Sequence, residues 1–279
     1  MATQGDEVPA YEDIAVEKVA DGNYAVVSLD RPDKLNALRD QTTVEIADAL
    51  KRMEMDPAVR CVVLRGTKEF SKKPSFSVGA DLSVGFPPFV KPNVPVHMDW
   101  VIFDRHRSVD AIEAFPKPLI AAVDGYALGG GFELTLLCDL VVASERSEFG
   151  FPEVQRGIFP AYGGTQRLVR HVGVARAKWL IYTGERVPAK QLEQWGYVAK
   201  VFPDDQFEQG VHELASKIGK GPTTALYVIK KAINFGTEVP LSIGLKFEQL
   251  GFAINSQSSD VVEGINAFFR RKEPEFKGF

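Results

Sequence analysis

Residues 118–167 read PLIAAVDGYALGGGFELTLLCDLVVASERSEFGFPEVQRGIFPAYGGTQR, and this stretch contains the pattern that decides the fold. The apolar run at 119–123 predicts a buried strand that ends in a turn. Three glycines at 129–131 precede an apolar segment at 132–138, which we expect to be a short helix. A second apolar run at 140–143 predicts another strand. This strand–helix–strand order is typical of parallel strands joined by crossover helices.

Glu133 closely follows the three glycines, and Glu153 follows the second strand and a Phe-Gly-Phe-Pro turn. Glycine permits positive φ and a close ligand approach, and the free N–H groups at a helix N-terminus attract negative charge. The pattern therefore predicts an anion-stabilising turn with two carboxylates nearby. It also fits a structural role, in which the glycines allow close packing and Glu133 complements the helix dipole. The apolar neighbours of Glu133 favour the functional interpretation, because a buried carboxylate is costly without a partner or a task.

Other segments follow the same strand and helix logic. A strand at 24–29, a helix at 38–55 and a strand at 61–64 are predicted before the central stretch. An open Rossmann sheet shares this order, but no Gly-x-Gly-x-x-Gly follows the first strand. Beyond residue 167 the periodicity predicts helices at 174–182, 189–195, 207–217, 223–234, 240–255 and 261–271. Gly196 and Gly236 are expected at helix C-terminal caps, and Ser258 at the N-cap of the last helix.

Composition sets limits on the function. The 279 residues carry a net charge of −4 and are 45% hydrophobic, which suits a sizeable core and gives no electrostatic case for binding nucleic acid or an anionic membrane. Cys61 and Cys138 lie in apolar runs, so we expect buried free thiols, and the scattered histidines show no metal-ligand spacing. There is no apolar run of about 18 residues and no signal-like N-terminus, which predicts a cytoplasmic protein without a membrane segment.

Several segments together resemble the crotonase (enoyl-CoA hydratase/isomerase) superfamily. Besides the central stretch they are 29–38 (LDRPDKLNAL), 76–82 (FSVGADL), 160–168 (PAYGGTQRL) and 263–276 (EGINAFFRRKEPEF). The resemblance covers about residues 12–279 and implies an α/β fold, a crotonase-like spiral of ββα repeats with a C-terminal helical region. It implies a flexible arm at 1–11, a spiral core with the CoA and catalytic site at 12–200, and a helical subdomain for oligomerisation and site closure at 201–279.

The resemblance also assigns roles to residues. A CoA thioester reacts at C2 and C3 when its carbonyl oxygen gathers negative charge as an enolate, and the family pattern stabilises that oxygen with the N–H groups of Ala80 and Gly130. Glu133 is expected to activate a water for C3, and Glu153 to deliver a proton to C2. Relatives that only isomerise double bonds generally keep one of these acids, so the presence of both favours hydration.

Substrate contacts are implied less specifically. The expected CoA-binding residues are Lys34, Val78, Ala80, Asp81 and Leu82, with Arg270, Arg271 and Lys272 of a neighbouring subunit as possible phosphate contacts. The expected acyl pocket comprises Phe86, Phe89, Val90, Met98, Ala161 and Tyr162. Alternatively, the basic C-terminal residues only complement a helix dipole, and the pocket aromatics only cover a core edge.

One motif departs from the family pattern, since Pro160-Ala161-Tyr162-Gly163-Gly164 stands where many hydratases have Pro-Gly-Ala-Gly-Gly. Ala161 keeps a backbone N–H that a catalytic water needs if its φ is negative. Tyr162 either favours short or polar acyl groups or simply packs against its neighbours.

The sequence therefore predicts an enoyl-CoA hydratase or 3-hydroxyacyl-CoA dehydratase that acts on a short-chain acyl-CoA. No metal or separate cofactor is expected, because coenzyme A is part of the substrate. By analogy with the family, the expected assembly is a homotrimer or homohexamer. The alternatives are a double-bond isomerase, a ring or thioester hydrolase acting through the same enolate, and a non-catalytic RNA-binding relative.

Overall fold

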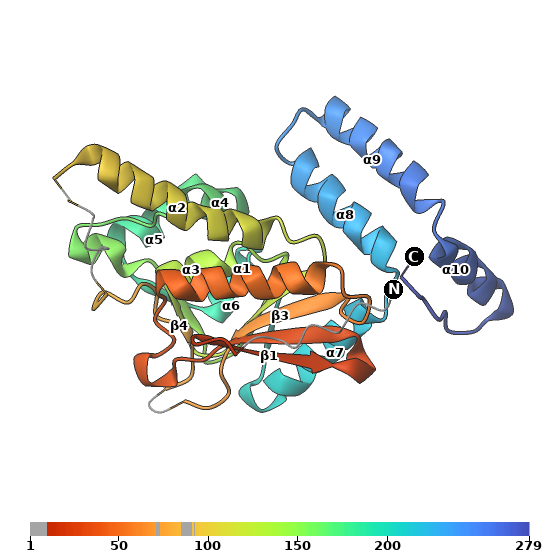
Figure 1. The fold of residues 1–279 in the computed structure, drawn as a ribbon, viewed down its shortest axis with the longest axis horizontal. Helices are drawn as coiled ribbons and strands as arrows, with labels where there is room; N and C mark the ends of the chain where they lie inside the picture. Colours follow the sequence, from red (N-terminus) through yellow and green to blue (C-terminus); the bar gives the residue numbers. More distant parts are fainter. Residues whose placement is uncertain (1–9, 71–72, 85–90, 92, 279) are drawn as a thin grey trace.

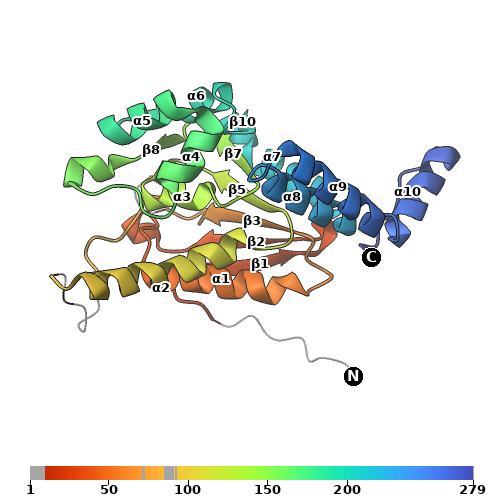
Figure 2. The ribbon, with the colours of Figure 1, turned by 90° about the horizontal axis from the view of Figure 1, so that it is seen from above.

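The computed structural model describes residues 10–70, 73–84, 91 and 93–278, and two β-sheets enclosed by helices form its centre (Figure 1, Figure 2). The larger sheet has the order β1 (Ile14–Val19), β2 (Tyr24–Leu29), β3 (Cys61–Gly66), β5 (Leu119–Val123), β7 (Leu140–Ser144) and β10 (Lys200–Phe202). The smaller sheet has the order β4 (Ser75–Ser77), β6 (Tyr126–Leu128), β8 (Glu148–Gly150) and β9 (Arg186–Pro188).

The helices of the described residues connect these strands and continue beyond them. They are α1 (Asp40–Glu54), α2 (Pro95–Glu113), α3 (Gly130–Thr135), α4 (Gly164–Val172), α5 (Val174–Thr183), α6 (Ala189–Gln194), α7 (Phe207–Gly219), α8 (Thr223–Gly236), α9 (Leu241–Asn255) and α10 (Ser259–Arg270). Short 3-10 turns include η2 (Pro32–Lys34) and η3 (Pro152–Arg156).

The chain winds as a spiral of ββα turns. Strands β3, β5 and β7 lie in the larger sheet, and each is followed by a strand of the smaller sheet, β4, β6 or β8. A helix then returns the chain to the next turn of the spiral. Strands β2, β3, β5, β7 and β10 run parallel, as do β4, β6 and β8. The predicted α/β spiral with parallel strands is thereby confirmed.

Both faces of the larger sheet are covered, and this explains its apolar strands. On β3, Val62 and Leu64 face a core shared with α1, whereas Cys61 and Val63 face Phe207 and its neighbours on α7. A strand buried on both faces reads as a continuous apolar run, and all six residues of β3 are buried. The larger sheet is therefore buried between two helical layers.

Several local predictions needed revision. The helix expected at 132–138 begins at Gly130 and ends at Thr135. By Asp139 the chain already pairs with the sheet, since the Asp139 N–H donates to the carbonyl of Leu119 in β5. The cap predicted at Gly196 is confirmed, since Gly196 follows α6 with φ +85°, as a C-terminal cap requires. Gly236 does not cap α8 with a left-handed turn but is its last helical residue, where it faces Gly244 and lets α8 and α9 approach closely. The N-cap role of Ser258 is confirmed, since its hydroxyl accepts from the Asp260 N–H.

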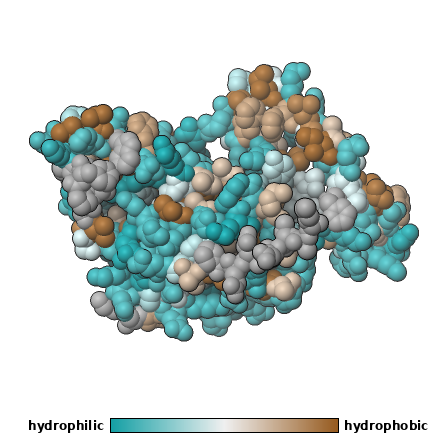
Figure 3. Space-filling model, viewed as in Figure 1, coloured by the Kyte–Doolittle hydropathy of each residue, from teal (hydrophilic) through white to brown (hydrophobic). Residues whose placement is uncertain are grey.

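Within the predicted C-terminal subdomain at 201–279, α7 packs on the sheet while α8, α9 and α10 extend to one side of it (Figure 1, Figure 2). The buried Lys230 of α8 ties this extension to the core by donating to Asp139 (2.7 Å) and to the Lys117 carbonyl (3.1 Å). Hydrophobic side chains gather on the outer surface of α8 and α9 (Figure 3). Among the described residues, no helix combines the length and apolar character needed to cross a membrane.

Candidate active site

The N-terminus of α3 lies against the end of β4, and glycine is what permits this contact. A Cβ on Gly131 would lie only 2.5 Å from the Ser77 carbonyl oxygen. Gly129 precedes the helix with φ +53° and ψ −127°, a backbone conformation that side chains disfavour. The first N–H groups of α3 therefore point toward the turn that follows β4.

That turn brings Ala80 to the same place. A parallel bridge joins Leu38 to Ala80, and it uses the carbonyl of Gly79 and the N–H of Asp81, both at 2.8 Å. The N–H of Ala80 thus lies on the opposite side of the bridge. A Cβ on Gly130 would lie 3.7 Å from the Ala80 nitrogen. Within the described part of the chain, the N–H groups of Ala80 and Gly130 donate to no protein acceptor. The two predicted donors are therefore adjacent and unused.

Glu133 lies in the first turn of α3 and is only 3% exposed. Its Oε1 accepts two backbone hydrogen bonds, from Tyr162 N–H at 2.7 Å and Gly164 N–H at 2.8 Å. Burial raises the pKa of Glu133 to about 7, the charge of Glu153 adds to this effect, and the two N–H donors oppose it. A carboxyl with such a pKa exchanges protons readily at neutral pH.

Glu153 lies in η3, and its carboxylate reaches back over the glycine turn. A Cβ on Gly129 would lie 2.9 Å from Glu153 Oε1, next to the predicted donor at Gly130. Its Oε2 is buried and has no hydrogen-bond partner among the described residues. Burial raises the pKa of Glu153, which favours the protonated acid. The fold thus joins two carboxyl groups, 20 positions apart in sequence, beside two free N–H donors.

A sequence profile of the family "Enoyl-CoA hydratase/isomerase" matches residues 20–278. The chain belongs to this family. It is 38% identical over 253 residues to the 2,3-dehydroadipyl-CoA hydratase of Escherichia coli (strain K12), an alignment that covers 91% of this chain and 94% of the relative. It is 34% identical over 272 residues to the mitochondrial enoyl-CoA hydratase of Pongo abelii, with 96% and 88% covered. The crystal structure of the enoyl-CoA hydratase from Bacillus anthracis matches with a TM-score of 0.85 at 34% identity, covering 96% of this chain and 100% of that one.

The segments that this family pattern assigns to CoA lie together beside the turn that carries Ala80. Lys34 is exposed in η2, and the next residue, Leu35, accepts a hydrogen bond from the Val78 N–H. Leu82 is exposed on the same turn. The Ser83 hydroxyl and the Arg31 guanidinium hold the pKa of Asp81 at about 2, so this carboxylate is ionised and anchored. Sequence reasoning did not anticipate Arg31 as the anchor of this turn.

The predicted acyl-pocket residues divide into two groups. Phe86, Phe89 and Val90 lie outside the described residues, and Met98 is half-buried on α2. Ala161 has a negative φ, as its predicted donor role requires, and its carbonyl lies 2.8 Å from His106 Nε2 of α2. The Tyr162 ring is partly buried against the core and meets the His106 ring edge to face. Packing of Tyr162 is thus established, and a contact with the acyl group stays a prediction.

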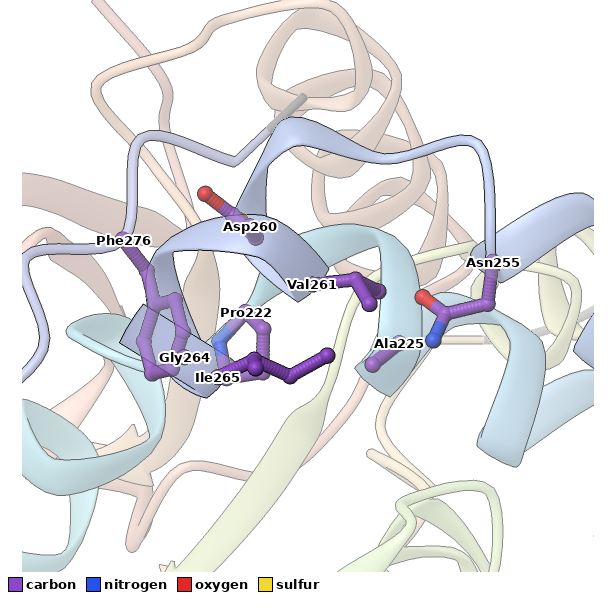
Figure 4. A pocket seen from close by; sticks show the side chains of 8 residues that line it. All are labelled: Pro222, Ala225, Asn255, Asp260, Val261, Gly264, Ile265 and Phe276. Atoms are coloured by element: carbon purple, nitrogen blue, oxygen red, sulfur yellow. The ribbon is translucent and has the colours of Figure 1, made fainter. Parts of the chain in front are cut away.

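The basic residues Arg270, Arg271 and Lys272 are exposed at the end of α10, far along the C-terminal extension from α3 (Figure 1). Between α8, α9, α10 and the C-terminal segment lies a mostly apolar cavity of about 240 Å³ (Figure 4). Asp260 at its edge accepts the N–H groups of Lys277 and Gly278, so this carboxylate fastens the C-terminal segment. The cavity is therefore separate from the paired glutamates.

Proposed function

We propose that the protein is an enoyl-CoA hydratase, a hydro-lyase that adds water reversibly across the 2,3 double bond of a short-chain enoyl-CoA. The observation that carries this proposal is the pair of buried carboxyl groups, Glu133 and Glu153, beside the unused N–H groups of Ala80 and Gly130. The hydratase names of the relatives support the same reaction.

In this proposal the thioester carbonyl oxygen accepts hydrogen bonds from the N–H groups of Ala80 and Gly130. Negative charge collects on that oxygen as water adds to C3, and the closeness of the two N–H groups supports their acting on one oxygen. Loss of one such donor costs about 3 kcal/mol in other enzymes. Because this charge is held by backbone dipoles, the proposed reaction needs no metal or redox cofactor.

The two glutamates divide the proton transfers. Glu133, fixed by two N–H donors and with a pKa near neutrality, takes a proton from water as the oxygen attacks C3. Glu153, whose burial favours the protonated form, delivers a proton to C2 of the enolate. Dehydration of a 3-hydroxyacyl-CoA uses the same groups in reverse.

The assembly and the phosphate contacts belong to this proposal. The C-terminal extension exposes large apolar side chains that an isolated chain would leave in water. They include Ile229, Ile233, Phe235, Leu241, Leu250, Phe252 and Ile254. A trimer or hexamer built on this surface would bury them and bring Arg270, Arg271 and Lys272 of one subunit toward the CoA site of another. Light scattering on the purified protein gives the mass directly, and a monomer would contradict this assembly.

The direct test follows the ultraviolet absorbance of the conjugated enoyl thioester after the protein is mixed with crotonyl-CoA. Rapid loss of absorbance with 3-hydroxybutyryl-CoA as the product is expected. The substrate set includes 2,3-dehydroadipyl-CoA, because the Escherichia coli relative is named for it. Formation of a shifted double bond or of free CoA, without a hydroxyacyl product, would overturn the hydratase in favour of an isomerase or a thioester hydrolase.

A further inference from the structure

The turn that holds Glu133 is itself held from outside the site. Arg167 of α4 donates through Nη1 to the Tyr162 carbonyl at 2.9 Å. The peptide N–H of the same Tyr162 donates to Glu133 Oε1. Arg167 therefore acts on one of the two donors of Glu133 without touching the carboxyl itself.

Glu113, the last residue of α2, fixes the direction of the Arg167 side chain. The guanidinium donates through Nε to Glu113 Oε1 at 2.8 Å and through Nη2 to Oε2 at 2.5 Å. A bidentate pair of this kind sets orientation as well as distance, which a lysine cannot reproduce. Arg167 is only 22% exposed, so its position is also restricted by packing.

Gly163 makes room for this arrangement. Its φ is +100°, and a Cβ at this position would lie 1.6 Å from Arg167 Nη1. The guanidinium thus occupies the space that any larger residue at 163 would fill. The Arg167 backbone also contacts this turn, since its N–H donates to the Gly163 carbonyl at 2.7 Å. Both the backbone and the side chain of Arg167 therefore donate hydrogen bonds to the 162–164 turn, which carries the two N–H donors to Glu133.

We propose that Arg167 is a positioning residue for Glu133, and that Glu113 orients it. By fixing the Tyr162 peptide, Arg167 keeps the N–H groups of Tyr162 and Gly164 directed at one carboxylate oxygen. Glu113 makes α2 part of this support, and α2 follows directly on the segment expected to shape the acyl pocket. The inference rests on the proposed hydration for its kinetic effect and on the described hydrogen bonds for its geometry.

The test compares Arg167→Gln, Arg167→Lys and Glu113→Gln with the matched control Arg170→Gln. Arg170 lies on the same helix and pairs with Glu238 at the surface. For Arg167→Gln we expect kcat to fall about 10²-fold with little change in KM, because a misplacement of about 1 Å can cost that much. Arg167→Lys and Glu113→Gln should retain part of the activity, and Arg170→Gln should match the wild type.

A second readout does not depend on turnover. The Glu133 carboxyl is titrated by infrared spectroscopy and assigned by its loss in Glu133→Gln. Glu153, Tyr162 and Arg167 are the titratable or charged groups that act on it from η3, from the 162–164 turn and from α4. Loss of the Arg167 charge and of the fixed N–H donors should raise the pKa of Glu133, and the acid limb of kcat/KM should move to higher pH with it. Arg170→Gln should move neither.

The outcomes separate the two proposals. An inactive wild-type protein on every enoyl-CoA would contradict the hydratase, while the infrared titration would still decide the role of Arg167. An active wild type together with an Arg167→Gln variant of unchanged kcat and unchanged Glu133 pKa would overturn the positioning role. If Arg167→Gln does not fold, as circular dichroism would show, Arg167→Lys and Glu113→Gln decide the question by the same two readouts.

Discussion

The two glutamates of the site are held by different means. Glu133 is fixed by two N–H donors from the turn before α4, so its orientation is set by the backbone of a second element. Glu153 lies in a short 3-10 turn, and its buried Oε2 has no hydrogen-bond partner among the described residues. A buried carboxylate oxygen without a partner is costly, which favours a proton on that group or a substrate atom beside it.

This difference supports the separate roles proposed for the two acids. The group with fixed donors keeps its acceptor lone pairs in one direction and is suited to orient and deprotonate a water. The group with a free oxygen and an elevated pKa is suited to carry a proton to carbon. Different proposed roles for two identical carboxyl groups thus follow from their unequal surroundings.

The largest expected effect comes from removing either carboxyl. Glu133→Gln and Glu153→Gln should each lower kcat by about 10²–10⁴-fold while CoA-ester binding is largely kept, because each acid–base role is worth about that much. Steady-state kinetics with crotonyl-CoA give kcat, and calorimetric titration of a saturated CoA ester gives binding. Glu145→Gln, at an exposed position after β7, is the control and should keep wild-type turnover. Near-normal turnover of either site variant would remove that glutamate from the mechanism.

A smaller effect is expected when the carboxyl group is kept but its position changes. A Cβ at position 164 would lie 2.8 Å from Pro160 Cβ, 2.9 Å from Phe151 Cζ and 3.0 Å from Glu133 Oε1, and one at position 129 would lie 2.9 Å from Glu153 Oε1. Gly164→Ala and Gly129→Ala should therefore displace one carboxyl each and lower kcat by about 10²-fold.

Gly173→Ala separates this displacement from backbone strain. Gly173 has φ +82° and no atom of the described residues within 4 Å of a Cβ. This variant should lose about 1 kcal/mol of unfolding free energy and keep its kcat. Equal kinetic losses in all three alanine variants, measured with crotonyl-CoA, would show that strain rather than carboxyl placement is being measured.

The smallest effect concerns the pH dependence of the unfolding free energy. The pKa of Glu133 is about 7 in the folded protein and 4.5 ordinarily, so between these values the folded state binds a proton that the unfolded chain has released. Unfolding free energy therefore decreases as pH rises through this window, is unaffected by Glu133 below it, and carries the full penalty above it. Glu133→Gln lacks the penalty.

Relative to Glu133→Gln, the wild type should thus lose about 3 kcal/mol of unfolding free energy between about pH 4 and pH 8. Urea denaturation at a series of pH values measures this difference. Glu153→Gln should show the same sign with a smaller amplitude, because Glu153 is less deeply buried. A pH-independent difference between wild type and Glu133→Gln would contradict the raised pKa.

Sequence reasoning reached the fold because the long elements have strong patterns. The apolar run of β5 and the periodicity of α1 were readable directly. The three-residue strands β4, β6 and β8 were not, since so short a segment has no measurable period. Yet these strands form the second sheet and set the spiral, which only the family resemblance suggested. Gly236 was misread because a helix-terminal glycine also serves close helix packing.

The sequence indicated the acids and donors of the candidate site, whose roles stay predictions, but not the residues that support them. Glu133 and Glu153 were recognisable from their motif, although no local pattern brings them together. The Arg167–Glu113 pair joins residues 54 positions apart, and His106 reaches Ala161 across 55. Such pairs link α2 to α4 and to the turn before it, and nothing in the neighbouring sequence of either residue indicates its partner.

The most direct test of the divided roles is solvent deuterium exchange at C2 of butyryl-CoA. This saturated thioester forms a thioester enolate that lacks only the C3 hydroxyl and has no double bond to hydrate, so exchange needs the proposed oxyanion donors and the C2 acid–base group alone. Mass spectrometry in deuterium oxide should show exchange by the wild type, most of it retained in Glu133→Gln, and a loss of about 10²-fold or more in Glu153→Gln. Equal losses in both variants, or normal exchange in Glu153→Gln, would contradict the account.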